Sequence, residues 1–101
     1  MSFVKLCKES ELTGEIKIIQ TKFGRIAVVR SGDRIHAFQD VCTHDNGTLS
    51  GGTLSGCEIE CPRHGARFDI RTGKALCMPA TEDIEVYPVR VNAGDIEADF
   101  S

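Results

Sequence analysis

The chain has 101 residues and a formal net charge of -3, with 41% hydrophobic and 27% charged residues. This length and composition predict one soluble globular domain, and the acidic balance argues against nucleic acid as the main partner, because phosphate binding needs a basic face. No apolar run approaches the roughly 20 residues of a membrane helix, and charges interrupt the N-terminal segment where a signal peptide would be apolar, so we expect a cytoplasmic protein with no membrane partner.

Short segments rich in β-branched residues recur along the chain between turn residues, whereas no segment keeps a helical period for three turns. The expected strands are 3–7, 15–20, 25–30, 34–39, 57–60, 67–70, 85–92 and 95–100. The segments 31–33 and 92–95 are typical of tight hairpin turns. This spacing predicts an all-β fold, a small antiparallel sandwich or barrel.

The middle of the chain has a different composition. Residues 40–56 hold four of the ten glycines among small polar residues, so we expect loops rather than core there. The resulting plan is one domain over 1–101, with basal β parts at 1–39 and 81–101 and a loop-rich insert at about 40–80 at one tip.

Two short motifs in this insert pair a cysteine with a histidine. Cys42-Thr43-His44 is a C-x-H pair, and after sixteen intervening residues Cys61-Pro62-Arg63-His64 is a C-x-x-H pair. Glycines that follow each pair, Gly47 and Gly65, let backbone N–H groups approach a bound group closely. Two loops that each supply one thiolate and one imidazole can close on a metal centre from two sides.

The residues alone leave several interpretations open. A mononuclear zinc could take all four side chains, but zinc sites usually pair like ligands, and C-x-H is tight for two ligands on one ion. A dinuclear iron cluster solves that geometry, with both cysteines on one iron and both histidines on the other. A mononuclear iron or copper site, a Cys–His nucleophile and base, and plain loop residues are the remaining alternatives.

The string C-T-H, sixteen residues, C-P-x-H-G resembles the Rieske iron–sulfur signature. Further along, Phe68-Asp69, the run TGKA at 72–75, Pro79-Ala80 and EVYPVRV at 85–91 resemble the small Rieske-type ferredoxins that serve bacterial ring-hydroxylating oxygenases. The resemblance covers nearly the whole chain. It implies antiparallel sheets with the cluster loops at one tip, and a third, proline-containing loop that Met78-Pro79-Ala80 would match.

This resemblance implies one [2Fe–2S] cluster as the cofactor, with Cys42 and Cys61 as ligands of the inner iron and His44 and His64 as ligands of the outer iron. It implies a one-electron carrier rather than an enzyme, without catalytic residues. The donor would be a flavin-dependent NAD(P)H reductase, and the acceptor a terminal oxygenase or another redox enzyme. No histidine follows His64, so the mononuclear iron site of a complete oxygenase cannot be built from these residues.

Four positions depart from the Rieske proteins of respiratory and photosynthetic complexes. At the positions of Gly47 and Arg63, those proteins carry the two cysteines of a disulfide that joins the loops. Ala66 and Phe68 stand where they carry serine and tyrosine, whose hydroxyls donate to cluster sulfur. Because such donors stabilise the reduced form, their absence predicts a low-potential carrier, nearer about -150 mV than about +300 mV.

The remaining cysteines and the third histidine have ordinary interpretations. Cys7, Cys57 and Cys77 are expected to be small buried hydrophobes, and His36 a surface histidine on a strand. Two rival functions from other classes are a structural zinc module for protein interaction and a redox- or cluster-sensing regulator.

Charge is unevenly distributed along the second half of the chain. Basic residues gather around the second motif: Arg63, Arg67, Arg71 and Lys74. The stretch 82–99 holds six acids and one base, Arg90. The pattern predicts either two solvated faces or a dipole whose positive end lies near the cluster and steers an acidic partner.

Overall fold

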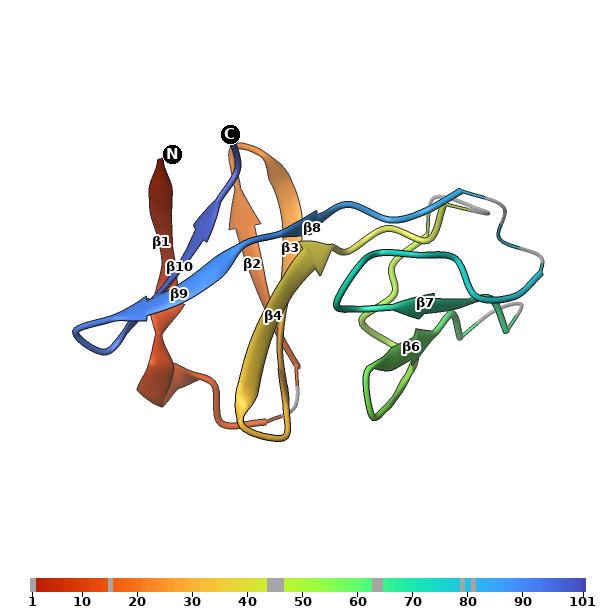
Figure 1. The fold of residues 1–101 in the computed structure, drawn as a ribbon, viewed down its shortest axis with the longest axis horizontal. Coiled ribbons are helices and arrows are strands. Elements are labelled where there is room, and N and C mark those ends of the chain that lie inside the picture. Colours follow the sequence, from red (N-terminus) through yellow and green to blue (C-terminus); the bar gives the residue numbers. More distant parts are fainter. Residues whose placement is uncertain (1, 15, 44–46, 63–64, 79, 81) are drawn as a thin grey trace.

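The structure, a computed structural model, describes residues 2–14, 16–43, 47–62, 65–78, 80 and 82–101. Over these residues the chain forms ten β-strands and one 3₁₀ turn (Figure 1). The elements in chain order are β1 (Phe3–Lys8), η1 (Glu9–Glu11), β2 (Ile16–Thr21), β3 (Gly24–Ser31), β4 (Arg34–Gln39), β5 (Thr53–Ser55), β6 (Glu58–Glu60), β7 (Arg67–Asp69), β8 (Val86–Tyr87), β9 (Val89–Asn92) and β10 (Asp95–Asp99). In this part of the chain no helix has the length and apolar character that a membrane crossing requires.

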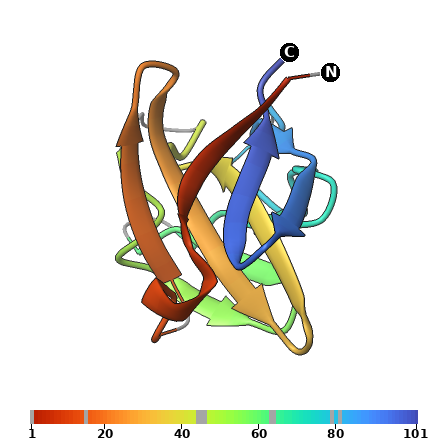
Figure 2. The ribbon, with the colours of Figure 1, turned by 90° about the vertical axis from the view of Figure 1, so that its left-hand side faces the viewer.

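The strands build three sheets, and every pairing between them is antiparallel, which confirms the predicted all-β class. The strand orders are β1-β10-β9, β2-β3-β4-β8 and β5-β6-β7. In Figure 1 the first two sheets lie at the left and the third at the right of a molecule that measures 40 × 26 × 19 Å. Figure 2, viewed from the left-hand end, shows the first sheet lying across the second.

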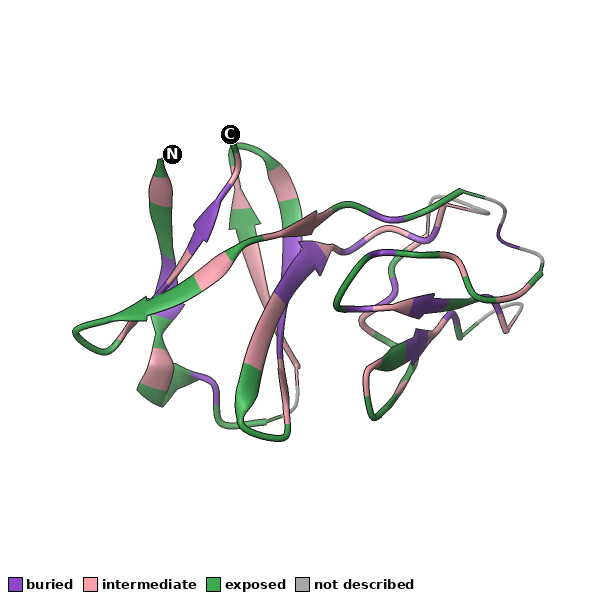
Figure 3. Cartoon of the chain, viewed as in Figure 1, coloured by how far each residue is buried: buried purple, intermediate pink, exposed green. Residues whose placement is uncertain are grey.

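Strand β3 joins two hydrophobic cores. Its four consecutive residues Ile26, Ala27, Val28 and Val29 are all fully buried. Because successive side chains of a strand point to opposite faces, Ile26 and Val28 pack in the core between the first two sheets, whereas Ala27 and Val29 pack in the core that extends toward β6 and β7. Figure 3 shows buried segments in β3, β4 and β10 at the left and in β6 and β7 at the right. This run of four apolar residues is therefore a strand with both faces covered.

Both predicted hairpin turns are confirmed. Ser31 pairs with Arg34 across the β3–β4 turn, and Asn92 pairs with Asp95 across the β9–β10 turn. The two central residues of the second turn, Ala93 and Gly94, both have positive φ, at 52° and 85°. Positive φ at both central residues is the geometry of the two-residue turn that suits the twist of antiparallel strands.

Two expectations about elements were wrong. Residues 85–92 are not one strand, because β8 pairs with β4 whereas β9 pairs with β10, and the chain changes sheets at Pro88, which has no N–H to donate to a ladder. Residues 40–56 are not loops throughout, because β5 forms within them and Leu49 is fully buried in the core. The 3₁₀ turn η1 had no counterpart in the predicted strand pattern.

Candidate metal centre

Cys42 and Cys61 each begin a loop of the same size. The N–H of Cys42 donates to the Gly47 carbonyl at 2.7 Å, and the N–H of Cys61 donates to the Ala66 carbonyl, also at 2.7 Å. Each hydrogen bond therefore closes a loop across five residues. In the second loop Gly65 takes φ +75°, a conformation that glycine adopts without steric cost, and its N–H donates to the Cys61 carbonyl at 3.2 Å. We call residues 42–47 and 61–66 the two ligand loops.

Both cysteine side chains lie inside an apolar core. Cys42 is 0% exposed and Cys61 is 1% exposed, and the same core contains Ala66 and Phe68. A thiolate is costly in such surroundings unless a positive charge, such as a metal ion, offsets the lost hydration. Two thiols that loops of equal size bring into one interior therefore fit a [2Fe–2S] cluster, of which they would be the cysteine ligands.

The two predicted histidine ligands, His44 and His64, lie outside the described residues, as does Arg63. Within the described part of the chain, no three His, Cys, Asp or Glu side chains gather around a position suited to a metal ion. The four-ligand arrangement therefore stays a prediction, of which the structure describes the cysteine half.

A buried carboxylate, Asp40, precedes the first ligand loop and binds the segment that follows it. The side chain of Asp40 is fully buried and accepts hydrogen bonds from the N–H groups of Leu49 and Ser50, both at 2.8 Å. Its other oxygen accepts from Nε of Arg25 on β3 at 3.0 Å. Asp40 thus connects the segment after the loop to the central sheet. The motif spacing gave no reason to single out this residue, and its only sequence signal is a position two residues before Cys42.

A third loop, residues 77–82, contacts both ligand loops. The thiol of Cys77 donates to the Gly65 carbonyl at 3.5 Å, and the hydroxyl of Thr43 donates to the Glu82 carbonyl at 2.6 Å. Between them Ala80 is 5% exposed and packs in the core that contains Cys42 and Cys61. The resemblance predicted a loop at this position, and its proline, Pro79, lies outside the described residues.

The other three cysteines differ in how far they are buried. Cys7 is buried at the base, as predicted. For Cys57 and Cys77 the prediction was wrong, because both are only half-buried and both have polar neighbours: Ser31 Oγ lies 3.8 Å from Cys57 Sγ, and Cys77 contacts Gly65. Each lies in a turn or loop, where part of the side chain stays in contact with water.

His36 lies half-buried on β4, near two guanidinium groups. Burial lowers the pKa of its imidazole, and the positive charges of Arg34 and Arg71 lower it further. The neutral form is therefore favoured. His36 lies on β4, outside the two ligand loops.

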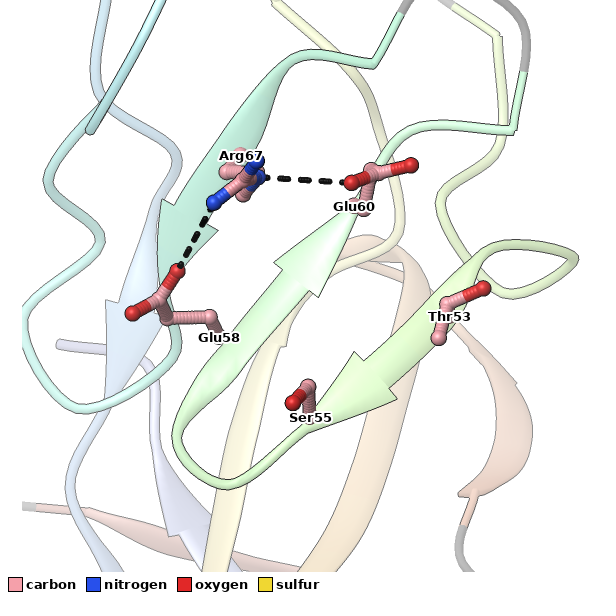
Figure 4. Close-up of a pocket in the computed structure, with 5 residues that line it drawn as sticks. All are labelled: Thr53, Ser55, Glu58, Glu60 and Arg67. Atoms are coloured by element: carbon pink, nitrogen blue, oxygen red, sulfur yellow. Dashed lines mark ion pairs between the residues drawn. The ribbon is translucent and has the colours of Figure 1, made fainter.

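Two of the four basic residues around the second motif, Arg67 and Arg71, form ion pairs in the structure. Arg67 on β7 lies between two glutamates of β6, with Nε 3.3 Å from Glu60 and one terminal nitrogen 4.0 Å from Glu58, above a depression of about 360 Å³ (Figure 4). Arg71 forms an ion pair with Asp69 at 2.9 Å and holds the pKa of that carboxyl below its usual range. Glu58 and Glu60 reach Arg67 only across the β6–β7 pairing, so the order of residues alone does not show them as its neighbours.

Comparison with known proteins gives one consistent result. The Rieske [2Fe-2S] domain family matches residues 2–88. Over 85 residues the chain is 41% identical to the ferredoxin component of the naphthalene 1,2-dioxygenase/salicylate 5-hydroxylase systems of Ralstonia sp, covering 84% of this chain and 82% of that protein. Sphingomonas yanoikuyae B1 ferredoxin superposes with a TM-score of 0.90 at 33% identity, covering 99% of this chain and 100% of that one. A chain in the complex of reduced oxygenase and oxidized ferredoxin in carbazole 1,9a-dioxygenase superposes with a TM-score of 0.86 at 36% identity, covering 95% of this chain and 91% of that one.

These similarities decide between the alternatives that the residues left open. A zinc module and a Cys–His nucleophile are both set aside, because the family that matches most of the chain is defined by a [2Fe–2S] domain. The similar proteins are ferredoxin components, electron carriers distinct from the catalytic oxygenase. The chain therefore belongs to the Rieske [2Fe–2S] domain family, and within it to the ferredoxins that carry electrons on one [2Fe–2S] cluster.

Proposed function

We propose that Cys42, Cys61, His44 and His64 bind the [2Fe–2S] cluster, and that residues of the insert at about 40–80 form the cluster-binding part of the single domain. The observation that carries this proposal is the pair of matched loops that place two buried cysteines in one core. When bound, such a cluster accepts and releases one electron at a time.

We further propose that the electron comes from a flavin-dependent NAD(P)H reductase and goes to the terminal oxygenase of a ring-hydroxylating system in the cytoplasm. Two exposed apolar side chains next to the ligand loops, Leu76 at 43% and Met78 at 74% exposure, support docking of a protein partner there, because exposed apolar groups of this size favour protein contacts. A similar ferredoxin, that of carbazole 1,9a-dioxygenase, is known in complex with its oxygenase.

The potential is proposed to lie at the low end of the Rieske range. Ala66 and Phe68 are both fully buried in the core that contains Cys61, and neither has a hydroxyl to donate to a cluster sulfur. The reduced form therefore lacks two stabilising hydrogen bonds, and we expect a midpoint nearer about -150 mV than about +300 mV. A clearly positive midpoint in a redox titration at neutral pH would contradict this.

The ligand assignment is tested by substitution of each ligand and by EPR of the reduced protein. We expect the wild-type protein to hold two iron and two sulfide per chain, with ¹⁴N couplings from two imidazoles in its reduced-state spectrum. Cys42→Ser, Cys61→Ser, His44→Ala and His64→Ala should each lose the cluster or these couplings, because each removes one ligand.

The chain supplies matched controls for both residue types. Cys57→Ser changes a half-buried cysteine in a turn, and His36→Gln changes a histidine on β4, so both should keep the full cluster and the unaltered spectrum. Loss of the nitrogen couplings in His36→Gln, or their persistence in both His44→Ala and His64→Ala, would overturn the assignment.

A further inference from the structure

A groove of about 560 Å³ lies between the β3–β4 hairpin and the insert. Its lining residues are polar or charged and come from both parts of the molecule: Ser31, Asp33, Arg34, His36, Cys57 and Arg71. The turn of the hairpin and the turn that leads into β6 meet at the lower edge in Figure 1, where the Ser31 hydroxyl donates to the Gly56 carbonyl at 2.8 Å. No lining residue belongs to the ligand loops or to the third loop, so this groove is separate from the proposed cluster site.

Three basic side chains, Arg34, His36 and Arg71, gather at this groove. All three also line an adjoining hollow of about 370 Å³ beside β8. Arg34 is exposed, and among the described residues no ion pair includes it. Its guanidinium therefore offers the groove a positive charge that no carboxylate of this part of the chain offsets by direct contact.

Arg71, on the opposite side of the groove, is oriented by Asp69. Nε and one terminal nitrogen of Arg71 donate to the two carboxylate oxygens of Asp69, at 3.1 Å and 2.9 Å. This pair uses one edge of the planar guanidinium and leaves the N–H donors of the other edge. Because one edge is already fixed, Arg71 loses less side-chain freedom when the other edge binds an anion.

His36 reports the sign of the charge in this groove. Burial lowers the pKa of its imidazole most, the positive charges of Arg34 and Arg71 lower it further, and the carboxylate of Asp69 offsets only part of this effect. The other titratable groups that line the groove or the adjoining hollow are Asp33, Cys57 and Tyr87. The potential at His36 is therefore positive, which favours an anion next to it.

We propose that this groove binds a doubly charged tetrahedral oxyanion, a sulfate or phosphate group, between the guanidinium groups of Arg34 and Arg71, with the imidazolium of His36 as a third donor. Donors on both sides of a groove, with a third between them, suit an anion with several oxygens better than a planar carboxylate. Asp33 lines the same groove and opposes binding through its negative charge. The site needs neither the cluster nor a redox partner, so it does not rest on the proposed function.

Sulfate is the first probe, because its charge stays constant over the pH range in which histidine titrates. His36 is the one histidine of the sequence outside the two ligand motifs, so its imidazole can be followed by NMR in the oxidised holoprotein. A bound anion stabilises the imidazolium, so sulfate should raise the pKa of His36 above its value in chloride at equal ionic strength. By the same linkage, sulfate should bind about threefold to tenfold more tightly at about pH 5 than at about pH 8. An equal pKa in the two salts would overturn the proposal.

Substitution of the two arginines tests where the anion lies. Arg34→Gln and Arg71→Gln should each weaken sulfate binding about threefold to twentyfold, the effect of one charged hydrogen bond at a partly exposed site. Arg34→Lys keeps the charge without the planar fork and should bind with intermediate affinity. Arg90→Gln is the matched control, because Arg90 is also half-exposed and forms an ion pair with Glu97 in another sheet. Equal affinities of the three glutamine variants would contradict the assignment.

Two further variants give effects that a general loss of stability cannot produce. Asp33→Asn removes the opposing charge, so it should strengthen sulfate binding about twofold to fivefold. His36→Gln should remove the pH dependence of binding while keeping the affinity measured at about pH 8. Weaker binding by Asp33→Asn, or an unaltered pH dependence in His36→Gln, would refute the proposed arrangement of donors.

Inorganic phosphate and phenyl phosphate distinguish two sources of the anion. Both are titrated at a pH at which they carry two charges, and the affinity is measured from resonances of the groove residues. Equal affinities indicate a free oxyanion as the ligand. Tighter binding of phenyl phosphate indicates a phosphate group on an organic molecule, whose ring would occupy the adjoining hollow against Val86 and Tyr87. If sulfate and both phosphates act only through ionic strength, the groove is not an anion site.

Discussion

Asp40 is the buried charge on which the first ligand loop depends. Asp40→Ala leaves the N–H groups of Leu49 and Ser50 without their acceptor, and we expect it to lower the free energy of unfolding by about 2–4 kcal/mol, the cost of stranding two such groups. Asp40→Asn keeps an acceptor oxygen and should cost about half as much. Urea unfolding of the holoprotein at neutral pH measures both.

Arg25→Gln is the comparison for this prediction. It removes the charged partner of Asp40 but leaves both N–H donors in place, and Arg25 itself is 45% exposed, so little of its charge is desolvated. We expect the smallest loss of the three variants. If Arg25→Gln were as damaging as Asp40→Ala, the ion pair rather than the two backbone donors would be what holds the loop.

The role of a residue was predictable from the sequence where it depends on spacing along the chain. It was not predictable where it depends on contacts that form only on folding. Cys42 and Cys61 stand out because a metal site needs its ligands at fixed offsets. Asp40 and Cys77 do not, since their partners Leu49 and Gly65 are found only after the loops close. The ion pairs of Arg67 were not predictable for the same reason, because strand pairing brings Glu58 and Glu60 close to it.

Two adjacent glycines before β5, Gly51 and Gly52, should respond in opposite ways to replacement by alanine. A Cβ on Gly52 would lie 1.8 Å from the Glu60 carbonyl oxygen, directly before Cys61, whereas a Cβ on Gly51 has only Pro62 Cγ near it, at 4.0 Å. We expect Gly52→Ala to displace β6 and to reduce cluster occupancy at least severalfold, and Gly51→Ala to be tolerated.

Iron content per chain after identical purification measures this difference between the two variants. The contrast separates a steric clash from the general effect of replacing glycine, which lowers the entropy of the unfolded chain in both cases. Equal iron content in the two variants would mean that β5 and β6 can move apart freely.

At the scale of elements, the expected segments all contain strands, including the three-residue β6 and β7, whereas β5 was missed and 85–92 was not divided. β5 has three residues inside a glycine-rich stretch, and it exists because β6 offers it a partner. The division between β8 and β9 follows from Pro88, a residue that the apolar pattern of 85–92 conceals. Pairing across the chain, rather than local preference, decides both.

At the scale of the whole molecule, the strand that is covered on every side, β3, should be the last part to unfold. β3 pairs with β2 and with β4, and both of its faces are buried, so the amides of residues 26–29 should exchange only through global unfolding. Hydrogen exchange followed by mass spectrometry or NMR should show the slowest rates there. Slower exchange in β1 or in β7 than in β3 would contradict the prediction that β3 is the most stable element.

The pairing of β1 with β10 also determines how this protein can be attached to something else. Phe3 pairs with Asp99, and both chain ends emerge on the side of the molecule that lies away from β5, β6 and β7 (Figure 1). A linker to an electrode surface, or a genetic fusion to a reductase, can therefore leave from either end and still present the ligand loops outward. Whichever end carries the linker, the path for docking stays clear.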